Sequence, residues 1–292
     1  MLEKLSKAGR VGVNVNGDLP EKEIAELSRF LSERVKIIWI GENPLFIDPF
    51  KVAEIVAENF EHLVGFGVLT PRKRAEEIYE NFKRLEKDYG ERFVLGVASG
   101  GFKLKDYEKF LKKLKEKFDE FLCGVTWLKS YEIAKKYCSG ILLNHVHPKH
   151  VEVFKDYDGF KAAYGPALIL PSEFYQDLII ACSIVMQTSK DFLKKFSYYK
   201  SYEKIKEVRI EELIKKRQRG ENLENNSEYE KLKAAAEKIL EFFTISGKLE
   251  DVSNRVKELL SLCDHVVLGD PFFRDKKSVE RVSLLLSRLG LS

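Results

Sequence analysis

Short apolar runs alternate with amphipathic stretches along the whole chain. Eight runs rich in Val, Ile, Leu and Phe are nearly continuous, as in strands that are buried on both faces of a parallel sheet. They are Arg10–Asn16, Val35–Glu42, Leu63–Val68, Arg92–Ala98, Glu120–Thr126, Gly140–Asn144, Ala162–Leu170 and His265–Asp270. The stretches between them repeat apolar residues at helical spacing. Clear examples are Pro20–Arg34, Pro71–Tyr89, Lys248–Cys263 and Lys276–Leu289. Strands and helices in this alternation predict an α/β fold, a (β/α)8 TIM barrel that residues 1–292 form as a single domain.

One connection is much longer than the others, and we predict that residues 172–243 form a helical excursion between the seventh and eighth strands. Ser172–Lys195 has the composition of an apolar helix, and Glu203–Lys238 that of charged helices interrupted at Arg219–Asn222. Residues 190–219 contain eleven Lys or Arg against five Asp or Glu. This excess is typical of a solvated helical surface, and it would also suit an electropositive wall for an anionic ligand.

Composition narrows the class of protein. The sequence has no apolar run long enough to span a membrane, and its polar amino terminus lacks a signal-peptide core. The net charge of +4 is too mild to indicate nucleic acid, so we expect neither a membrane nor a nucleic-acid partner. Four cysteines without a CxxC pair predict buried, reduced thiols in a cytoplasmic protein. A charged fraction of 33%, rich in Lys and Glu, favours a thermophilic source.

In a barrel of this kind the chemistry lies at the carboxyl ends of the strands. Polar and glycine residues gather at these ends. The second predicted strand ends at Glu42, the third at Gly67-Val68, the fourth before Ser99-Gly100-Gly101, and the sixth at Asn144-His145. Glycine allows the backbone to approach a flat ring or a phosphate closely, although it can equally relieve crowding in a barrel.

Five segments of the sequence carry a resemblance to a known family. They are IIWIGENP at Ile37–Pro44, GFGVLTPRKR at Gly65–Arg74, RFVLGVASGG at Arg92–Gly101, CSGILLNHVHPKHVEVF at Cys138–Phe154, and the carboxyl-terminal stretch Phe242–Val282. Their order and spacing resemble the luciferase-like monooxygenase superfamily of (β/α)8 barrels. Within it they look most similar to the coenzyme F420-dependent methylenetetrahydromethanopterin reductases.

The resemblance implies an oxidoreductase that uses coenzyme F420, or alternatively FMN. Hydride would pass between the cofactor and a small carbonyl, imine or pterin-like substrate. It implies a non-prolyl cis peptide bond at Gly67-Val68 behind the cofactor ring, and a catalytic role for Glu42. It implies cofactor contacts from Gly67, Val68, Ser99, Gly100, Gly101, Asn144 and His145. It also implies a homodimer and an archaeal, cytoplasmic protein.

Three departures from the family pattern leave an alternative open. Asn14 stands where the family usually has a glutamate, and an amide cannot act as an acid or base. The connection Gly101–Asp119 is short, and the fifth strand ends in Thr126–Ser130 without the usual small residues. Trp127 in that stretch would either stack on a ring or fill the space of the missing loop. The alternative is a non-catalytic homologue that binds a cofactor or an anionic ligand.

The histidines suggest a second alternative, a metal-dependent hydrolase. His145 and His147 form an HxH pair at a strand end, with His150 close behind. Metal-dependent hydrolases of this fold class carry such a pair near the first strand, whereas here it follows the sixth. We therefore predict no metal site, and we expect His147 and His150 to cap the helix at Pro148–Phe154.

Overall fold

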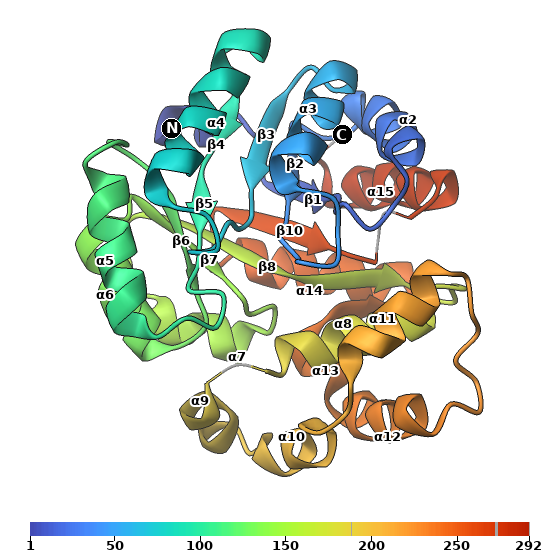
Figure 1. Cartoon of the computed structure of the whole chain (residues 1–292). Helices are drawn as coiled ribbons and strands as arrows, with labels where there is room; N and C mark the ends of the chain where they lie inside the picture. Colours follow the sequence, from blue (N-terminus) through green and yellow to red (C-terminus); the bar gives the residue numbers. More distant parts are fainter. Residues whose placement is uncertain (188, 272–273, 292) are drawn as a thin grey trace.

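In the computed structural model, which describes residues 1–187, 189–271 and 274–291, parallel strands form a barrel surrounded by helices (Figure 1). The strands are β1 Val11–Asn14, β2 Ile37–Ile40, β3 Leu63–Phe66, β4 Phe93–Val94, β5 Gly96–Val97, β6 Leu122–Val125, β7 Gly140–Leu143, β8 Phe160–Ile169 and β10 His265–Gly269. They pair in the order β4-β3-β2-β1-β10-β8-β7-β6-β5. The fourth predicted strand is split at Leu95: β4 pairs with β3 and β5 pairs with β6, which closes the ring. The (β/α)8 prediction is confirmed.

The outer helices follow the predicted stripes. They are α2 Glu21–Ser32, α3 Pro49–Asn59, α4 Ala75–Tyr89, α5 Leu104–Lys115, α6 Leu128–Tyr137, α7 Pro148–Val151, which continues into a 3-10 turn at Glu152–Phe154, α14 Leu249–Leu260 and α15 Lys276–Leu289. The stripe Ala75, Ile78, Phe82 and Leu85 is the buried face of α4, and Gly90 ends that helix with φ +84°. The buried face of α2 consists of Ile24, Leu27, Ser28 and Leu31, whereas Phe30 is 36% exposed.

The inside of the barrel is a packed core. The residues that fill it include Ile37, Trp39, Val94, Leu122, Leu142, Ala162 and Val267. Leu5 from α1 (Leu2–Ser6) and Ala8 join this cluster from the segment that precedes β1. That segment packs against the core at the amino-terminal end of the barrel, which leaves the carboxyl-terminal end for function.

The excursion between β8 and β10 is helical, as predicted. It contains α8 Tyr175–Val185, α9 Lys190–Lys195, α10 Tyr199–Ile205, α11 Ile210–Gln218, α12 Ser227–Ala236, a 3-10 turn at Glu237–Ile239, and α13 Leu240–Phe243. The single apolar helix expected over Ser172–Lys195 is divided into α8 and α9. A short strand that the sequence pattern did not predict, β9 Ile245–Gly247, pairs with the end of β8. The expected interruption lies between α11 and α12, where Gly220 has φ +77°.

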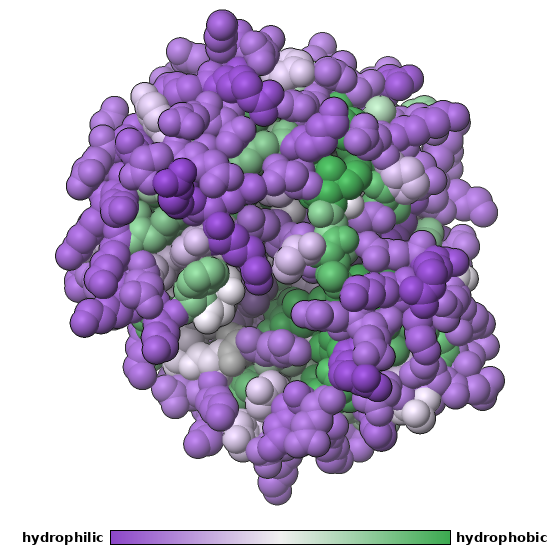
Figure 2. Space-filling view, in the orientation of Figure 1, coloured by the Kyte–Doolittle hydropathy of each residue, from purple (hydrophilic) through white to green (hydrophobic). Residues whose placement is uncertain are grey.

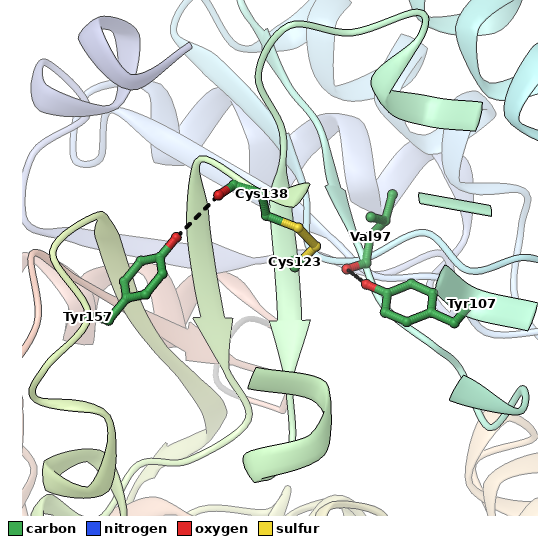
Figure 3. Close-up of a disulfide and its surroundings, with 5 residues drawn as sticks. All are labelled: Val97, Tyr107, Cys123, Cys138 and Tyr157. Carbon is green, nitrogen blue, oxygen red and sulfur yellow. Dashed lines mark hydrogen bonds between the residues drawn. A yellow bond between two sulfur atoms is a disulfide. The ribbon is translucent and has the colours of Figure 1, made fainter. Parts of the chain in front are cut away.

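The prediction of reduced thiols is wrong for two of the four cysteines. Cys123 and Cys138 form a disulfide, shown in Figure 3. Cys123 lies in β6 and Cys138 just before β7, and the pairing of these neighbouring strands places the two Cα atoms 5.9 Å apart. That separation lies within the range of disulfides, and sequence spacing alone did not reveal it. Cys182 and Cys263 are free and buried.

None of the helices in the described ranges combines the length and the apolar character that crossing a bilayer requires. Residues 272 and 273, part of the last segment of the family resemblance, lie outside the described residues.

Candidate active site

Five small residues lie together at the carboxyl ends of β2, β3, β5 and β6. We call Gly41, Gly67, Val68, Ala98 and Gly124 the small-residue floor. A Cβ placed on Gly124 would lie 2.6 Å from the Cβ of Ala98 and 3.5 Å from Cγ1 of Val68. A Cβ placed on Gly41 would lie 3.7 Å from the carbonyl oxygen of Gly67. All five are partly exposed, so they offer a ligand a surface with few projecting side chains.

The peptide bond between Gly67 and Val68 is cis, as the family resemblance implied. The following residue returns to the barrel: Leu69 donates from its N–H to the Gly96 carbonyl at 2.9 Å, and Ala98 donates to the Leu69 carbonyl at 2.8 Å. The ring of Tyr164 lies against Gly67, with Cε1 only 2.7 Å from the position that a Cβ would take. The floor therefore rests on a large side chain from β8.

Glu42 holds the loop that follows the floor. Its Oε2 accepts hydrogen bonds from the Thr70 N–H at 2.8 Å and from the Thr70 hydroxyl at 2.5 Å. Its own N–H donates to the carbonyl of Val68 at 3.2 Å. Thr70 in turn packs against Gly100, whose ideal Cβ would lie 2.5 Å from Cγ2 of Thr70. Glu42 thus links the loops after β2, β3 and β5.

Asn14 has a structural role at the end of β1. Its Nδ2 donates to the Trp39 carbonyl and to Oδ1 of Asn16, both at 3.0 Å, and its Oδ1 accepts from the N–H of Asp270 at 3.3 Å. Asn16 Oδ1 also accepts from the N–H of Gly41 at 3.1 Å. Asn14 is 3% exposed, and its amide joins the ends of β1, β2 and β10. It holds the edge of the floor, and its amide cannot act as an acid or a base.

A cluster of aromatic rings fills the mouth beside the ends of β6 and β7. We call it the aromatic plug; it consists of Trp127, His145, His150, Phe154, Phe192, Phe196, Tyr198, Phe242 and Phe243. Trp127 is 5% exposed and meets Phe192 edge-on with ring centroids 5.2 Å apart. Of the two roles expected for Trp127, the structure favours filling of space.

The plug covers one of the predicted cofactor contacts. His145 is 2% exposed, its ring centroid is 4.6 Å from that of Phe192, and its Nε2–H donates to the Thr126 carbonyl at 2.8 Å. Its neighbour Asn144 is partly exposed, as is Ser99 across the mouth. Gly100 and Gly101 are exposed, and their φ angles of +55° and +85° make the turn that glycine favours.

Burial lowers the pKa of all three clustered histidines, His145, His147 and His150. Burial lowers the pKa of His145 to about 4, and burial together with the neighbouring His145 lowers that of His150 to about 2. His147 caps α7 as predicted, since its Nδ1 accepts from the N–H of Lys149 at 3.3 Å. His150 does not cap the helix; its Nε2 is 3.0 Å from the Tyr198 hydroxyl. Among the described residues no group of three or more His, Cys, Asp or Glu side chains is placed to hold a metal ion.

The sequence interpretation missed a group of buried charges. Nη2 of Arg274 lies 2.6 Å from Oδ2 of Asp18 and 2.7 Å from Oδ2 of Asp270. Beside it Arg217 of α11 forms two hydrogen bonds with the carboxylate of Asp177 on α8, at 3.1 and 2.9 Å. These residues line a cavity of about 50 Å³. Asp18 and Asp270 both follow barrel strands, and that position was a signal that could have pointed to them.

The loops that follow the strands gather near the centre of the view in Figure 1, and Figure 2 shows a hollow there with apolar residues along part of its rim. Three of the large exposed apolar side chains belong to segments that follow barrel strands: Phe102 after β5, Leu128 after β6, and Ile184 on α8. The mouth therefore combines apolar contact surface with a few polar groups, as small-molecule sites do.

Comparison with solved structures identifies proteins of the same fold. A coenzyme F420-dependent tetrahydromethanopterin reductase from Methanopyrus kandleri superimposes with a TM-score of 0.73 at 18% identity, over 94% of this chain and 97% of that one. An F420-dependent secondary alcohol dehydrogenase in complex with an F420–acetone adduct gives a TM-score of 0.65 at 10% identity, over 97% and 99% of the two chains. A long-chain alkane monooxygenase gives 0.58 at 10% identity, over 97% and 92%. No family model and no curated protein matches the sequence.

Proposed function

We propose, because the chain has the luciferase-like superfamily fold, that it is an oxidoreductase which binds coenzyme F420, with FMN as the alternative cofactor. The observation that supports the proposal best is the small-residue floor at the carboxyl end of the barrel. A floor with few side chains can accept a flat ring in contact with the backbone, and the similarity in fold covers 94% of the chain.

The residues around the floor fit such a ring. Gly67 and Val68 would lie beneath it, while Ser99, Gly100, Gly101 and Asn144 would border it as partly or fully exposed groups. His145 would act from behind Asn144, since it is buried in the aromatic plug. The cofactor would supply hydride-transfer chemistry, and the protein would supply orientation and the exclusion of water.

Glu42 would act on the cofactor through the backbone. Its hydrogen bonds fix Thr70 and the Val68 carbonyl, so it would determine how far the floor lies from the cofactor ring. A substrate with a carbonyl or imine carbon would bind above the ring, within the hollow seen in Figure 2. The non-catalytic alternative has one specific observation in its favour: the Asn14 amide is fully engaged in structural hydrogen bonds and replaces the expected acid.

The proposal is tested by titrating the purified protein with F420 and, separately, with FMN while following cofactor fluorescence. We expect saturable binding of one of them. The variant Ala98→Leu, which extends a side chain over Gly124 and Val68, should weaken binding at least about tenfold because it occupies the floor. Ala25→Leu on the outer helix α2 is the matched control and should bind like the wild type.

No binding of either cofactor by a folded wild-type protein would refute the proposal, as would equal binding by Ala98→Leu. Binding without turnover of any carbonyl or imine substrate would favour the non-catalytic alternative instead. Tm values of all variants must be measured in parallel, so that a loss of binding can be separated from a loss of fold.

A further inference from the structure

The buried charges at the ends of β1 and β10 form a site distinct from the floor. Asp18 follows β1, Asp270 follows β10, and Arg274 lies between their carboxylates. The excursion covers this group: Asp177 on α8 and Arg217 on α11 complete it from above. In Figure 1, α8 and α11 lie side by side over this edge of the barrel, and the two helices pack together.

The charges of this site do not balance. Three carboxylates, from Asp18, Asp177 and Asp270, face two guanidinium groups, from Arg217 and Arg274, so one negative charge is in excess. Of the three, the side chains of Asp18 and Asp177 are 4% and 7% exposed. Burying an uncompensated charge is costly, and a group in that position takes up either a proton or a cation.

Protonation behaviour agrees with the charge count. Burial, together with the nearby carboxylate of Asp18, raises the pKa of Asp270 to about 7, although Arg274 acts in the opposite direction. The charge of Asp270 also acts on Tyr164, whose pKa is raised by burial and then by Asp270. Gln218, the remaining polar residue of the cavity wall, is neutral.

The remaining walls of the cavity are apolar. They comprise Phe46, Ile180, Ala181, Ile184 and Ile214. The site is connected to the floor through hydrogen bonds, since the Asp270 N–H binds Asn14 and Asn14 binds Asn16, which holds the N–H of Gly41. A ligand with a positive nitrogen and a short apolar body would satisfy both the charge and the walls of this cavity.

We propose that this cavity is the subsite for a cationic nitrogen of the substrate, an amine or an iminium group with a short aliphatic or ring substituent. The carboxylates of Asp18 and Asp270 bind the nitrogen, and α8 and α11 enclose its apolar part. The inference deepens the proposed function, because the carbon bonded to this nitrogen would then face the neighbouring floor. It selects nitrogen-containing substrates over neutral alcohols and carbonyl compounds.

The test uses isobutylammonium as the probe and isobutanol as its neutral analogue, without any cofactor. Protein-detected NMR titration should give saturable shifts with the amine and at least about tenfold weaker binding of the alcohol. Because binding needs ionised Asp270, the affinity for the amine should rise about tenfold between pH 6 and pH 8, as the ionised fraction rises through a pKa of about 7.

Asp270→Asn and Asp18→Asn should each weaken amine binding at least about tenfold, and Asp270→Asn should also abolish its pH dependence. Asp106→Asn, on the outer helix α5, is the matched control. Equal binding of amine and alcohol would overturn the proposal, as would an amine affinity that does not depend on pH. Ala98→Leu separates the two hypotheses: it should weaken cofactor binding at least about tenfold and leave amine binding unchanged.

Discussion

Gly67→Ala tests the contact on which the small-residue floor is built. The new Cβ would lie 2.7 Å from Cε1 of Tyr164 and 3.1 Å from Cε3 of Trp39, both closer than carbon atoms normally approach. Trp39 is fully buried in the barrel, and the Tyr164 ring packs against the same inner cluster. Forcing an extra methyl group into such a core typically costs about 1–3 kcal/mol. We therefore expect the free energy of unfolding to fall by about 2 kcal/mol.

The assay is urea unfolding followed by fluorescence, combined with a double-mutant cycle. Tyr164→Leu removes the atom that the new methyl group meets, so the cost of Gly67→Ala should fall by about 0.5–2 kcal/mol in that background. Gly41→Ala is the matched control, because its Cβ meets a side-chain tip, Oδ1 of Asn16 at 2.9 Å, and should be tolerated better. An equal cost of Gly67→Ala with and without Tyr164 would refute the packing argument.

Two further predictions concern stability. His145 and His265 are buried, and burial lowers their pKa values to about 4. Between pH 6.5 and pH 4 the unfolded chain therefore binds protons that the native state excludes. Each histidine should lower the free energy of unfolding by about 1.4 kcal/mol per pH unit as the pH falls through this range. In urea titrations at several pH values, His145→Gln should reduce that slope. Asp270, whose pKa is raised to about 7, changes the free energy of unfolding with pH in the opposite direction in both proteins. An unchanged slope in the variant would contradict the prediction. The Cys123–Cys138 disulfide closes a sequence separation of 15, so Cys123→Ser should lower the free energy of unfolding by about 3 kcal/mol relative to the oxidised wild type. A count of four free thiols in the native wild type would show that the bond is not formed.

The barrel could be predicted from the sequence because its signals are local. A strand that is buried on both faces, such as Ile37–Ile40, must be apolar throughout, and an outer helix such as Ala75–Tyr89 must carry a single stripe. The cis bond at Gly67-Val68 was expected from resemblance, since nothing in local composition distinguishes it from other glycine-containing turns. The split at Leu95 and the strand β9 escaped prediction because both depend on which neighbour a short segment meets.

The candidate site was only partly predictable, because its chemistry depends on contacts between residues far apart in the sequence. Glu42 was identified from its place at a strand end, whereas its hydrogen bond to Thr70, 28 positions further along the chain, could not be inferred from the sequence. Arg274 joins Asp18 and Asp270 across the junction between the first and last strands, a contact that no periodicity encodes. His145 was expected beside the cofactor, but the Phe192 ring that covers it comes from the excursion.

Under the proposed function, the excursion would limit which ligands the mouth accepts. Phe192 from α9 and Tyr198, which precedes α10, close the mouth beside β6 and β7, whereas Asp177 from α8 and Arg217 from α11 cover the charged cavity beside β1 and β10. Between these two covers the floor remains partly exposed. The barrel strands supply a surface with few projecting side chains, while the excursion would decide which second ligand the proposed site accepts. Changes in substrate preference should accordingly follow substitutions in α8 and α11 and leave cofactor affinity at the floor unchanged.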